Sequence, residues 1–114
     1  MKSKILNIPE TNFGGVYALV DQKGKKYIGS SKDIKKRIIF HDTHIKEYLQ
    51  NGRDGYLNYK MQKAIDDGAV FRCEILATFL CEMSSKEMRA IERVFVEKYG
   101  GIKDLYNCVN ITNP

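Results

Sequence analysis

A predicted β-hairpin near the start of the chain sets the framework for the rest of the fold. Residues 15–20 follow a two-residue alternation that is apolar on both faces, which predicts a strand. The next four residues, Asp21-Gln22-Lys23-Gly24, favour a turn. The strand pattern resumes over 26–29, so the two segments are expected to pair as an antiparallel hairpin.

The rest of the pattern predicts three helices and one more strand in a single α+β domain. Ser31 or Asp33 can cap the first helix. Ser84 followed by Glu87 forms a capping-box pattern at the start of the last helix. The expected ranges are a first helix up to residue 51, a second helix over 56–67, a central strand over 70–79 and a third helix over 84–99.

An N-terminal arm is expected over 1–13, because this segment has no clear periodicity and contains Pro9 and Asn12. We expect it to be extended or poorly ordered, with the domain proper spanning 14–114. No stretch approaches the ~20 consecutive apolar residues of a membrane-spanning helix. The basic N-terminus also lacks the apolar run of a secretory signal. We therefore expect a soluble, cytoplasmic protein that has no membrane partner.

The charge of the chain points toward polyanions. Nineteen Lys and Arg residues against fourteen Asp and Glu residues give a net charge of +5, and the segment 23–37 is especially basic. Clustered positive charge attracts nucleic acids, although a solvated helix face gives the same pattern. The three cysteines do not have zinc-finger spacing.

Two polar residues of the first helix are candidate catalytic groups. Arg37 and His41 are four residues apart and therefore share a helix face, which is expected to point to solvent or into a cleft. Arginine suits phosphate oxygens, and histidine exchanges protons near neutral pH. An ordinary basic helix surface is the alternative. The apolar stripe expected to face the core consists of Ile34, Ile38, Ile45 and Leu49.

Glu92 interrupts the apolar stripe of the third helix, which Met88, Phe95 and Tyr99 define. Burying a carboxylate is costly unless a partner or a metal compensates its charge. Glu92 is therefore either a functional carboxylate or one half of a buried salt bridge, for example with Arg37.

Tyr17 and Tyr27 are expected on neighbouring strands of the hairpin. Such tyrosines often form a packed pair, and a phenol with a pKa near ~10 is a poor base unless a nearby cation lowers that pKa. Gly15 and Gly29 either let the backbone approach a phosphate or make a bend. In the tail, Asn107 could hold a tyrosine, a carboxylate or a phosphate, or could be an ordinary turn residue.

Taken together and in this order, these residues resemble the GIY-YIG endonuclease family, particularly the catalytic domains of phage and intron-encoded homing endonucleases. The resemblance extends over about residues 15–111. Val16 stands where the first motif usually has isoleucine, which is a mild apolar exchange. The matching positions are Gly15-Val16-Tyr17, Tyr27-Ile28-Gly29, Arg37, His41, Glu92 and Asn107.

The resemblance implies a three-stranded antiparallel sheet flanked by helices, and hydrolysis of a DNA phosphodiester with one divalent ion, Mg²⁺ or Mn²⁺, in each active site. Glu92 would hold the metal, and Arg37 would stabilise the charged transition state. Either Tyr17 or His41 would be the general base. The cleft would be shaped by Tyr27, Gly29 and Asn107, and the DNA would be bound by Lys26 and Lys36.

Relatives that recognise long target sites carry a further DNA-binding domain, which is not found in this sequence. We therefore expect either a small stand-alone endonuclease with little sequence specificity of its own or a catalytic fragment of a longer protein. The alternative functions are a non-catalytic nucleic-acid-binding module and a structure-specific nuclease for branched or damaged DNA. No small-molecule substrate is expected. The sequence leaves open the oligomeric state and whether one or both strands are cut.

Overall fold

The predicted hairpin forms the centre of the structure. In a computed structural model, which describes residues 2–108, β2 (Gly15–Val20) pairs antiparallel with β3 (Lys26–Ser31). The carboxylate of Asp21 closes the turn between them, accepting hydrogen bonds of 2.9 Å from the backbone nitrogens of Lys23 and Lys25. The hairpin prediction is therefore confirmed.

The sheet has four strands rather than three. β4 (Phe71–Thr78) pairs antiparallel with β2, and the two-residue strand β1 (Ile5–Leu6) pairs parallel with β4, in the order β1-β4-β2-β3. The expected α+β class is confirmed, but the expected three-stranded antiparallel sheet is wrong. Ile5 is buried in the core, and its backbone nitrogen donates a 3.1 Å hydrogen bond to the carboxylate of Asp42. Two residues are too few for an alternating pattern to reveal a strand.

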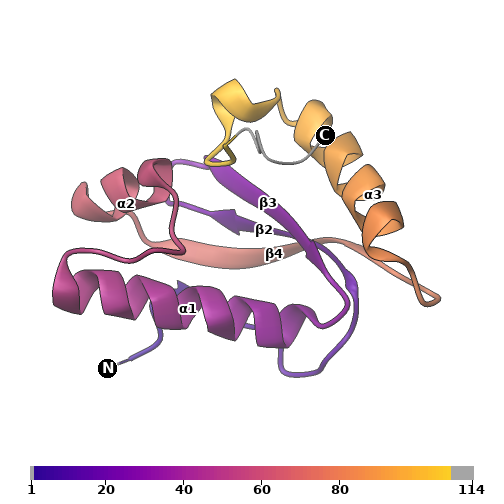
Figure 1. Cartoon of the computed structure of the whole chain (residues 1–114), viewed down its shortest axis with the longest axis horizontal. Coiled ribbons are helices and arrows are strands. Elements are labelled where there is room, and N and C mark those ends of the chain that lie inside the picture. The colour runs from indigo at the N-terminus through magenta and orange to yellow at the C-terminus, as the bar shows by residue number, and fades with distance from the viewer. Residues whose placement is uncertain (1, 109–114) are drawn as a thin grey trace.

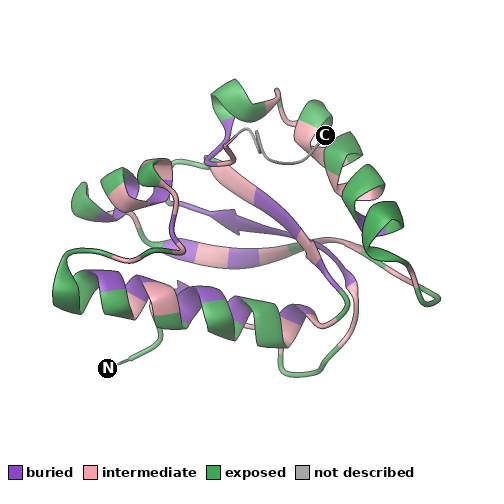
Figure 2. Cartoon of the chain, viewed as in Figure 1, coloured by how far each residue is buried: buried purple, intermediate pink, exposed green. Residues whose placement is uncertain are grey.

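Helices cover both faces of the sheet (Figure 1). α1 (Ile34–Asn51) and α2 (Tyr59–Asp66) pack on one face, and α3 (Ser85–Lys98) packs on the other. All six residues of β2 are buried because both of its faces are covered (Figure 2). The apolar alternation of the first strand therefore divides between two cores. Tyr17 and Leu19 belong to the core under α1 and α2, and Val16, Ala18 and Val20 belong to the core under α3.

Local side-chain chemistry sets the helix ends. Asp33 rather than Ser31 caps α1, accepting a 3.0 Å hydrogen bond from the nitrogen of Lys36. The predicted capping box of α3 is present. α2 begins at Tyr59, three residues later than expected, because Asn58 caps it. None of the helices between residues 2 and 108 is long and apolar enough to cross a membrane.

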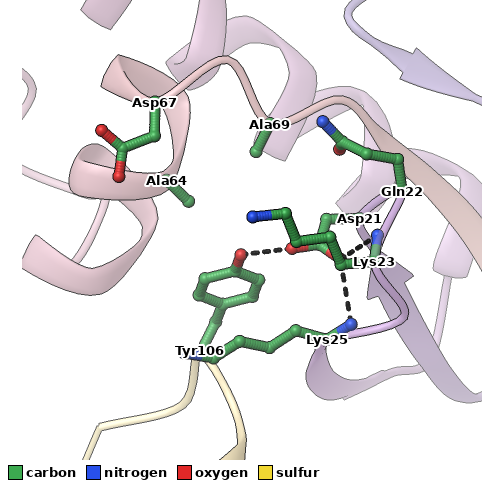
Figure 3. Close-up of a pocket in the computed structure, with 8 residues that line it drawn as sticks. All are labelled: Asp21, Gln22, Lys23, Lys25, Ala64, Asp67, Ala69 and Tyr106. Atoms are coloured by element: carbon green, nitrogen blue, oxygen red, sulfur yellow. Dashed lines mark hydrogen bonds between the residues drawn. The ribbon is translucent and has the colours of Figure 1, made fainter.

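The chain after α3 returns to the hairpin through the short 3₁₀ helix η1 (Ile102–Asp104). The hydroxyl of Tyr106 donates a 2.5 Å hydrogen bond to the Asp21 carboxylate, and the Lys25 ammonium lies 4.7 Å from the centroid of the Tyr106 ring (Figure 3). These contacts hold the tail against β3. The apolar pattern of the tail also predicts that Val109 and Ile111 pack back on the domain; both lie outside the described residues. A cavity of about 380 Å³ beside this contact is lined by Asp21, Gln22, Lys23, Lys25, Ala64, Asp67, Ala69 and Tyr106.

Candidate active site

Tyr17 of β2 lies across Gly29 of β3, and the space exists only because Gly29 has no side chain. The two residues are register partners in the hairpin. A Cβ atom added to Gly29 would stand 2.4 Å from the hydroxyl oxygen of Tyr17. The tyrosine itself is almost fully buried, and its hydroxyl lies 2.7 Å from Nε2 of His41. The glycine of the second motif therefore makes room for the tyrosine of the first.

His41 belongs to the buried face of α1, so of its two expected orientations, toward solvent or into a cleft, the first is wrong. With Tyr27 and Tyr56 it lines a small cavity of about 40 Å³. It is only 3% exposed, and its ring contacts Tyr17, Tyr27 and Tyr56 with centroid distances of 5.8, 5.5 and 5.4 Å. The expected apolar stripe is wrong at one further position, since Leu49 is exposed and Tyr48 is buried in its place. The three tyrosine rings around His41 explain how this polar side chain fits on the buried face of α1. The buried face of α1 consists of Ile34, Ile38, His41, Asp42, Ile45 and Tyr48.

Burial determines the protonation states of Tyr17 and His41. Burial lowers the pKa of His41 to about 3, and the positive charges of Arg37 and His44 act in the same direction. Burial also raises the pKa of the Tyr17 phenol, well above its ordinary value. At neutral pH the imidazole is therefore neutral and the phenol is protonated. In this state the Tyr17 hydroxyl can donate to Nε2, with the imidazole proton on Nδ1.

The lowered pKa of His41 predicts a stability change at acid pH. In the unfolded chain this histidine takes up a proton near pH 6.5, whereas the folded protein resists protonation down to about pH 3. Stability should therefore fall as the pH drops through this window, by up to about 1.4 kcal/mol per pH unit. Urea unfolding at pH 7, 6 and 5 measures the effect. His41→Gln should show a smaller loss between these pH values, and an equal loss in both proteins would contradict the assignment.

Glu92 reaches the hairpin from the opposite face of the sheet. Its carboxylate accepts a 2.8 Å hydrogen bond from the hydroxyl of Ser30, the residue after Gly29. Burial raises the pKa of Glu92, while Ser30 and the charges of Arg37 and Arg89 oppose the rise. Between residues 2 and 108 it forms no ion pair within 4.0 Å. A half-buried carboxylate without an ion pair is a suitable ligand for a hard divalent cation, which prefers oxygen donors. The donor set therefore fits Mg²⁺ or Mn²⁺.

Arg37 is the exposed cation of the site. Its charge lowers the pKa of Tyr17, of Tyr27 and of Glu92, so it acts on groups from β2, β3 and α3 at once. Lys36 lies beside it at the start of α1. An open cavity of about 380 Å³ at this helix start is lined by Ser31, Asp33, Lys36, Arg37 and Phe40.

Asn107 contacts the middle of β3, whereas Lys26 lies at the turn end of this strand. The side-chain oxygen of Asn107 accepts from the nitrogen of Ile28 and its amide donates to the oxygen of Ile28, both at 2.8 Å. It thereby supports the strand between Tyr27 and Gly29. Lys26 lies at the turn end of β3, roughly 13 Å along an extended strand from Ser30. Its ammonium lies 4.9 Å from the centroid of the Tyr99 ring. The ammonium also donates a 3.3 Å hydrogen bond to the oxygen of Gly24, so the side chain of Lys26 contacts the turn and Tyr99.

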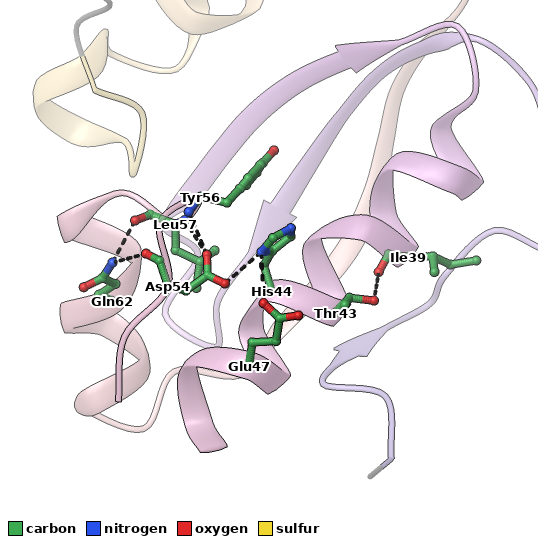
Figure 4. A network of polar contacts seen from close by, with 8 residues as sticks. All are labelled: Ile39, Thr43, His44, Glu47, Asp54, Tyr56, Leu57 and Gln62. Atoms are coloured by element: carbon green, nitrogen blue, oxygen red, sulfur yellow. Dashed lines mark hydrogen bonds and ion pairs between the residues drawn. The ribbon is translucent and has the colours of Figure 1, made fainter. Parts of the chain in front are cut away.

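Three further groups lie near the site, and the sequence did not single them out for it. Ser30 holds Glu92, and Tyr56 contacts His41. A group formed by His44, Glu47 and Asp54 has its ligand atoms within 4.8 Å of one another, the closest such His, Cys and carboxylate group in the described part of the chain (Figure 4). No local motif distinguishes the His44 group, because the loop after α1 brings Asp54 back to His44 and Glu47 on the helix.

The His44 group has a structural role as it stands. His44 Nδ1 lies 2.8 Å from one Asp54 oxygen, and the other accepts from the nitrogens of Tyr56 and Leu57 at 2.8 and 3.1 Å (Figure 4). Although burial opposes it, these bonds lower the pKa of Asp54 to about 2. The contacts fasten the loop to α1. The same atoms are suitable ligands for a divalent cation, so residues 2–108 offer two candidate metal positions, this group and Glu92.

Comparisons with known proteins agree with the fold. The family model described as the GIY-YIG catalytic domain matches residues 13–103. Among solved structures, the catalytic domain of the homing endonuclease I-TevI is similar, with a TM-score of 0.64 and 24% sequence identity. The match covers 85% of this chain and 99% of that domain. The search of curated proteins gives no significant match.

Proposed function

Because the chain belongs to the GIY-YIG family of nuclease catalytic domains, we propose that it is a metal-dependent DNA endonuclease that hydrolyses a phosphodiester bond. The observation that carries the proposal is the meeting of two elements at Gly29 and Ser30. Tyr17 reaches this point from β2, and Glu92 reaches it from α3. Arg37 acts electrostatically on both side chains.

Glu92 would hold one divalent ion, Mg²⁺ or Mn²⁺, together with water and phosphate oxygens. When bound, such an ion lowers the pKa of water and offsets the charge that develops on the phosphate. Ser30 orients the carboxylate, since its hydroxyl donates a 2.8 Å hydrogen bond to one of the two oxygens. The raised pKa of Glu92 is consistent with this role, because a cation would relieve the cost of its burial.

Tyr17 would position the attacking water, and His41 would act through Tyr17. With a pKa of about 3, His41 is a weak proton acceptor. By accepting the Tyr17 proton in a hydrogen bond, it leaves the lone pairs of the phenol oxygen free to accept from water. This makes Tyr17 a hydrogen-bond acceptor that orients the attacking water, and it makes His41 a residue that positions Tyr17.

The remaining predicted residues would bind the DNA or support the site. Arg37 would stabilise the transition-state charge, and Lys36 would contact a neighbouring phosphate. Asn107 would support β3 through its two bonds to the backbone of Ile28. Lys26 would contact DNA only if the substrate extends along the whole of β3. A contact surface of this size would give little sequence preference, and affinity would fall as salt rises. We also propose a cytoplasmic location.

Plasmid nicking tests the proposal. The parent protein should nick supercoiled plasmid in the presence of Mg²⁺ or Mn²⁺, and Arg37→Ala should nick about a hundredfold more slowly, as expected when one transition-state donor is lost. Arg53→Ala is the matched control, because Arg53 is an exposed arginine on the loop after α1. Equal rates for Arg37→Ala and Arg53→Ala would refute the role of Arg37. DNA binding without any nicking would favour a non-catalytic nucleic-acid-binding module.

A further inference from the structure

Phe40 is a large aromatic side chain that stays partly in solvent beside the candidate site. It is 43% exposed and borders the same cavity as Lys36 and Arg37. The Arg37 guanidinium carbon lies 6.0 Å from the centroid of its ring. Phe40 belongs to neither hydrophobic core of the described chain. The burial of a core therefore does not explain an aromatic residue at this position.

Two neighbouring rings hold Phe40 in place. Tyr56 and His44 lie against it edge to face, with centroid distances of 4.6 and 4.4 Å and interplanar angles of 87° and 68°. His44 is itself fixed by its 2.8 Å contact with Asp54 and by stacking on Tyr56. A ring that is already held loses little conformational freedom when it binds a partner, so ordering the ring costs little binding free energy.

The surrounding charges indicate which partner suits this ring. Lys36 and Arg37 attract phosphate, and an exposed aromatic ring stacks on another planar group. A nucleotide combines a phosphate with a planar base, which is the combination that proteins bind with cationic grooves and aromatic platforms. A base inside a duplex is already stacked on both sides. Phe40 can therefore reach the face of a base only where that base is unpaired or flipped out.

We propose that Phe40 stacks on an unpaired nucleobase next to the phosphate bound by Arg37, so that the preferred substrate is DNA with unpaired bases, such as a bulge or a flap. The proposal rests on the proposed function, because Arg37 must bind a DNA phosphate for Phe40 to meet its base. It gives the protein a preference for structure rather than for sequence, since every base offers an aromatic face.

The first test compares two DNA ligands in fluorescence anisotropy. One is a labelled duplex with a two-nucleotide bulge, and the other is the same duplex without the bulge. Both are measured in a Glu92→Gln background, where binding can be followed without cutting. Phe40→Ala should weaken binding of the bulged DNA about tenfold, the loss expected for one base–aromatic stack, and should leave binding of the perfect duplex nearly unchanged.

Ile39→Ala is the matched control. Ile39 is the neighbouring residue of α1 and is 45% exposed, but it does not line the cavity. It should change binding of neither DNA. Phe40→Trp should keep the preference for the bulged duplex and Phe40→Leu should lose it, which separates stacking from simple packing if Phe40→Ala proves unstable. Equal weakening of both ligands by Phe40→Leu, or no weakening of either, would overturn the proposal.

Photocrosslinking provides an independent readout. A bulge that carries 5-iododeoxyuridine should crosslink under ultraviolet light to the peptide that contains Phe40, as identified by mass spectrometry. Crosslinking elsewhere in the chain, with none at Phe40, would overturn the stacking proposal. A protein that crosslinks at Phe40 but never nicks plasmid would refute the nuclease function and retain the base contact. A protein that nicks plasmid but binds the bulged and the perfect duplex with equal affinity would retain the nuclease function and refute the base contact.

Discussion

Glu92→Gln is expected to slow plasmid nicking by about a thousandfold, because metal-assisted charge stabilisation supplies several kcal/mol and each factor of ten in rate corresponds to about 1.4 kcal/mol. Glutamine has nearly the same shape and can still accept a hydrogen bond from Ser30, which lies 2.8 Å from the native carboxylate. The fold and the DNA affinity should therefore stay close to those of the parent. Nicking with Mg²⁺ and binding by anisotropy measure the two properties separately.

The control for this prediction is Glu47→Gln, which changes the exposed carboxylate of the His44 group in the same way. It should nick at nearly the parental rate if the catalytic ion binds at Glu92. The opposite result, with Glu47→Gln inactive and Glu92→Gln active, would place the ion between His44, Glu47 and Asp54. Because the two substitutions are chemically identical, the comparison distinguishes the two candidate metal positions directly.

Gly29→Ala is expected to remove most of the activity by displacing Tyr17. The new Cβ atom would stand 2.4 Å from the Tyr17 hydroxyl oxygen, so the ring must move and its 2.7 Å contact with His41 must lengthen. A misplacement of about 1 Å in an active site can cost about a hundredfold in rate. Overpacking of a buried position should also lower the free energy of unfolding by about 2 kcal/mol. Nicking assays and urea unfolding measure these two effects.

Gly15→Ala should act on the sheet instead. Its Cβ atom would stand 2.0 Å from the backbone oxygen of Ala77 in β4, and a backbone atom cannot rotate away as a side chain can. We therefore expect the free energy of unfolding to fall by about 3 kcal/mol or more. Gly55→Ala is the control for both glycines, because a Cβ atom there meets nothing within 4 Å. A Gly29→Ala protein that nicks at the parental rate would contradict the steric role of Gly29.

The sequence was most informative where the local pattern is strong. The hairpin of β2 and β3 followed from a continuous apolar alternation around a turn, and the capping box of α3 followed from Ser84 and Glu87. Glu92 could be singled out because it interrupts an apolar stripe. These inferences succeed because a helix or strand repeats its environment at a regular spacing, and a polar residue at an apolar position costs free energy unless it has a partner.

The sequence was weaker where the environment of a residue comes from distant segments. His41 was expected on a face that points to solvent or into a cleft, but three tyrosines from β2, β3 and the loop before α2 enclose it. A ring of aromatic side chains can accommodate a neutral imidazole, and nothing in the sequence of α1 indicates that ring. β1 was missed for a similar reason, since its pairing with β4 and its contact with Asp42 span long sequence separations.

By itself, the amino-acid order determined the α+β class and the hairpin, because both follow from patterns repeated within short segments. It also determined the family to which the chain belongs, through an ordered set of motif residues spread along the chain. Tertiary structure alone decided which groups meet around Gly29 and Ser30. It also decided that His41 is buried and neutral and that Phe40 is left exposed beside Arg37. Burial, and with it the charge state of a side chain, depends on neighbours brought from other elements, which no single segment encodes.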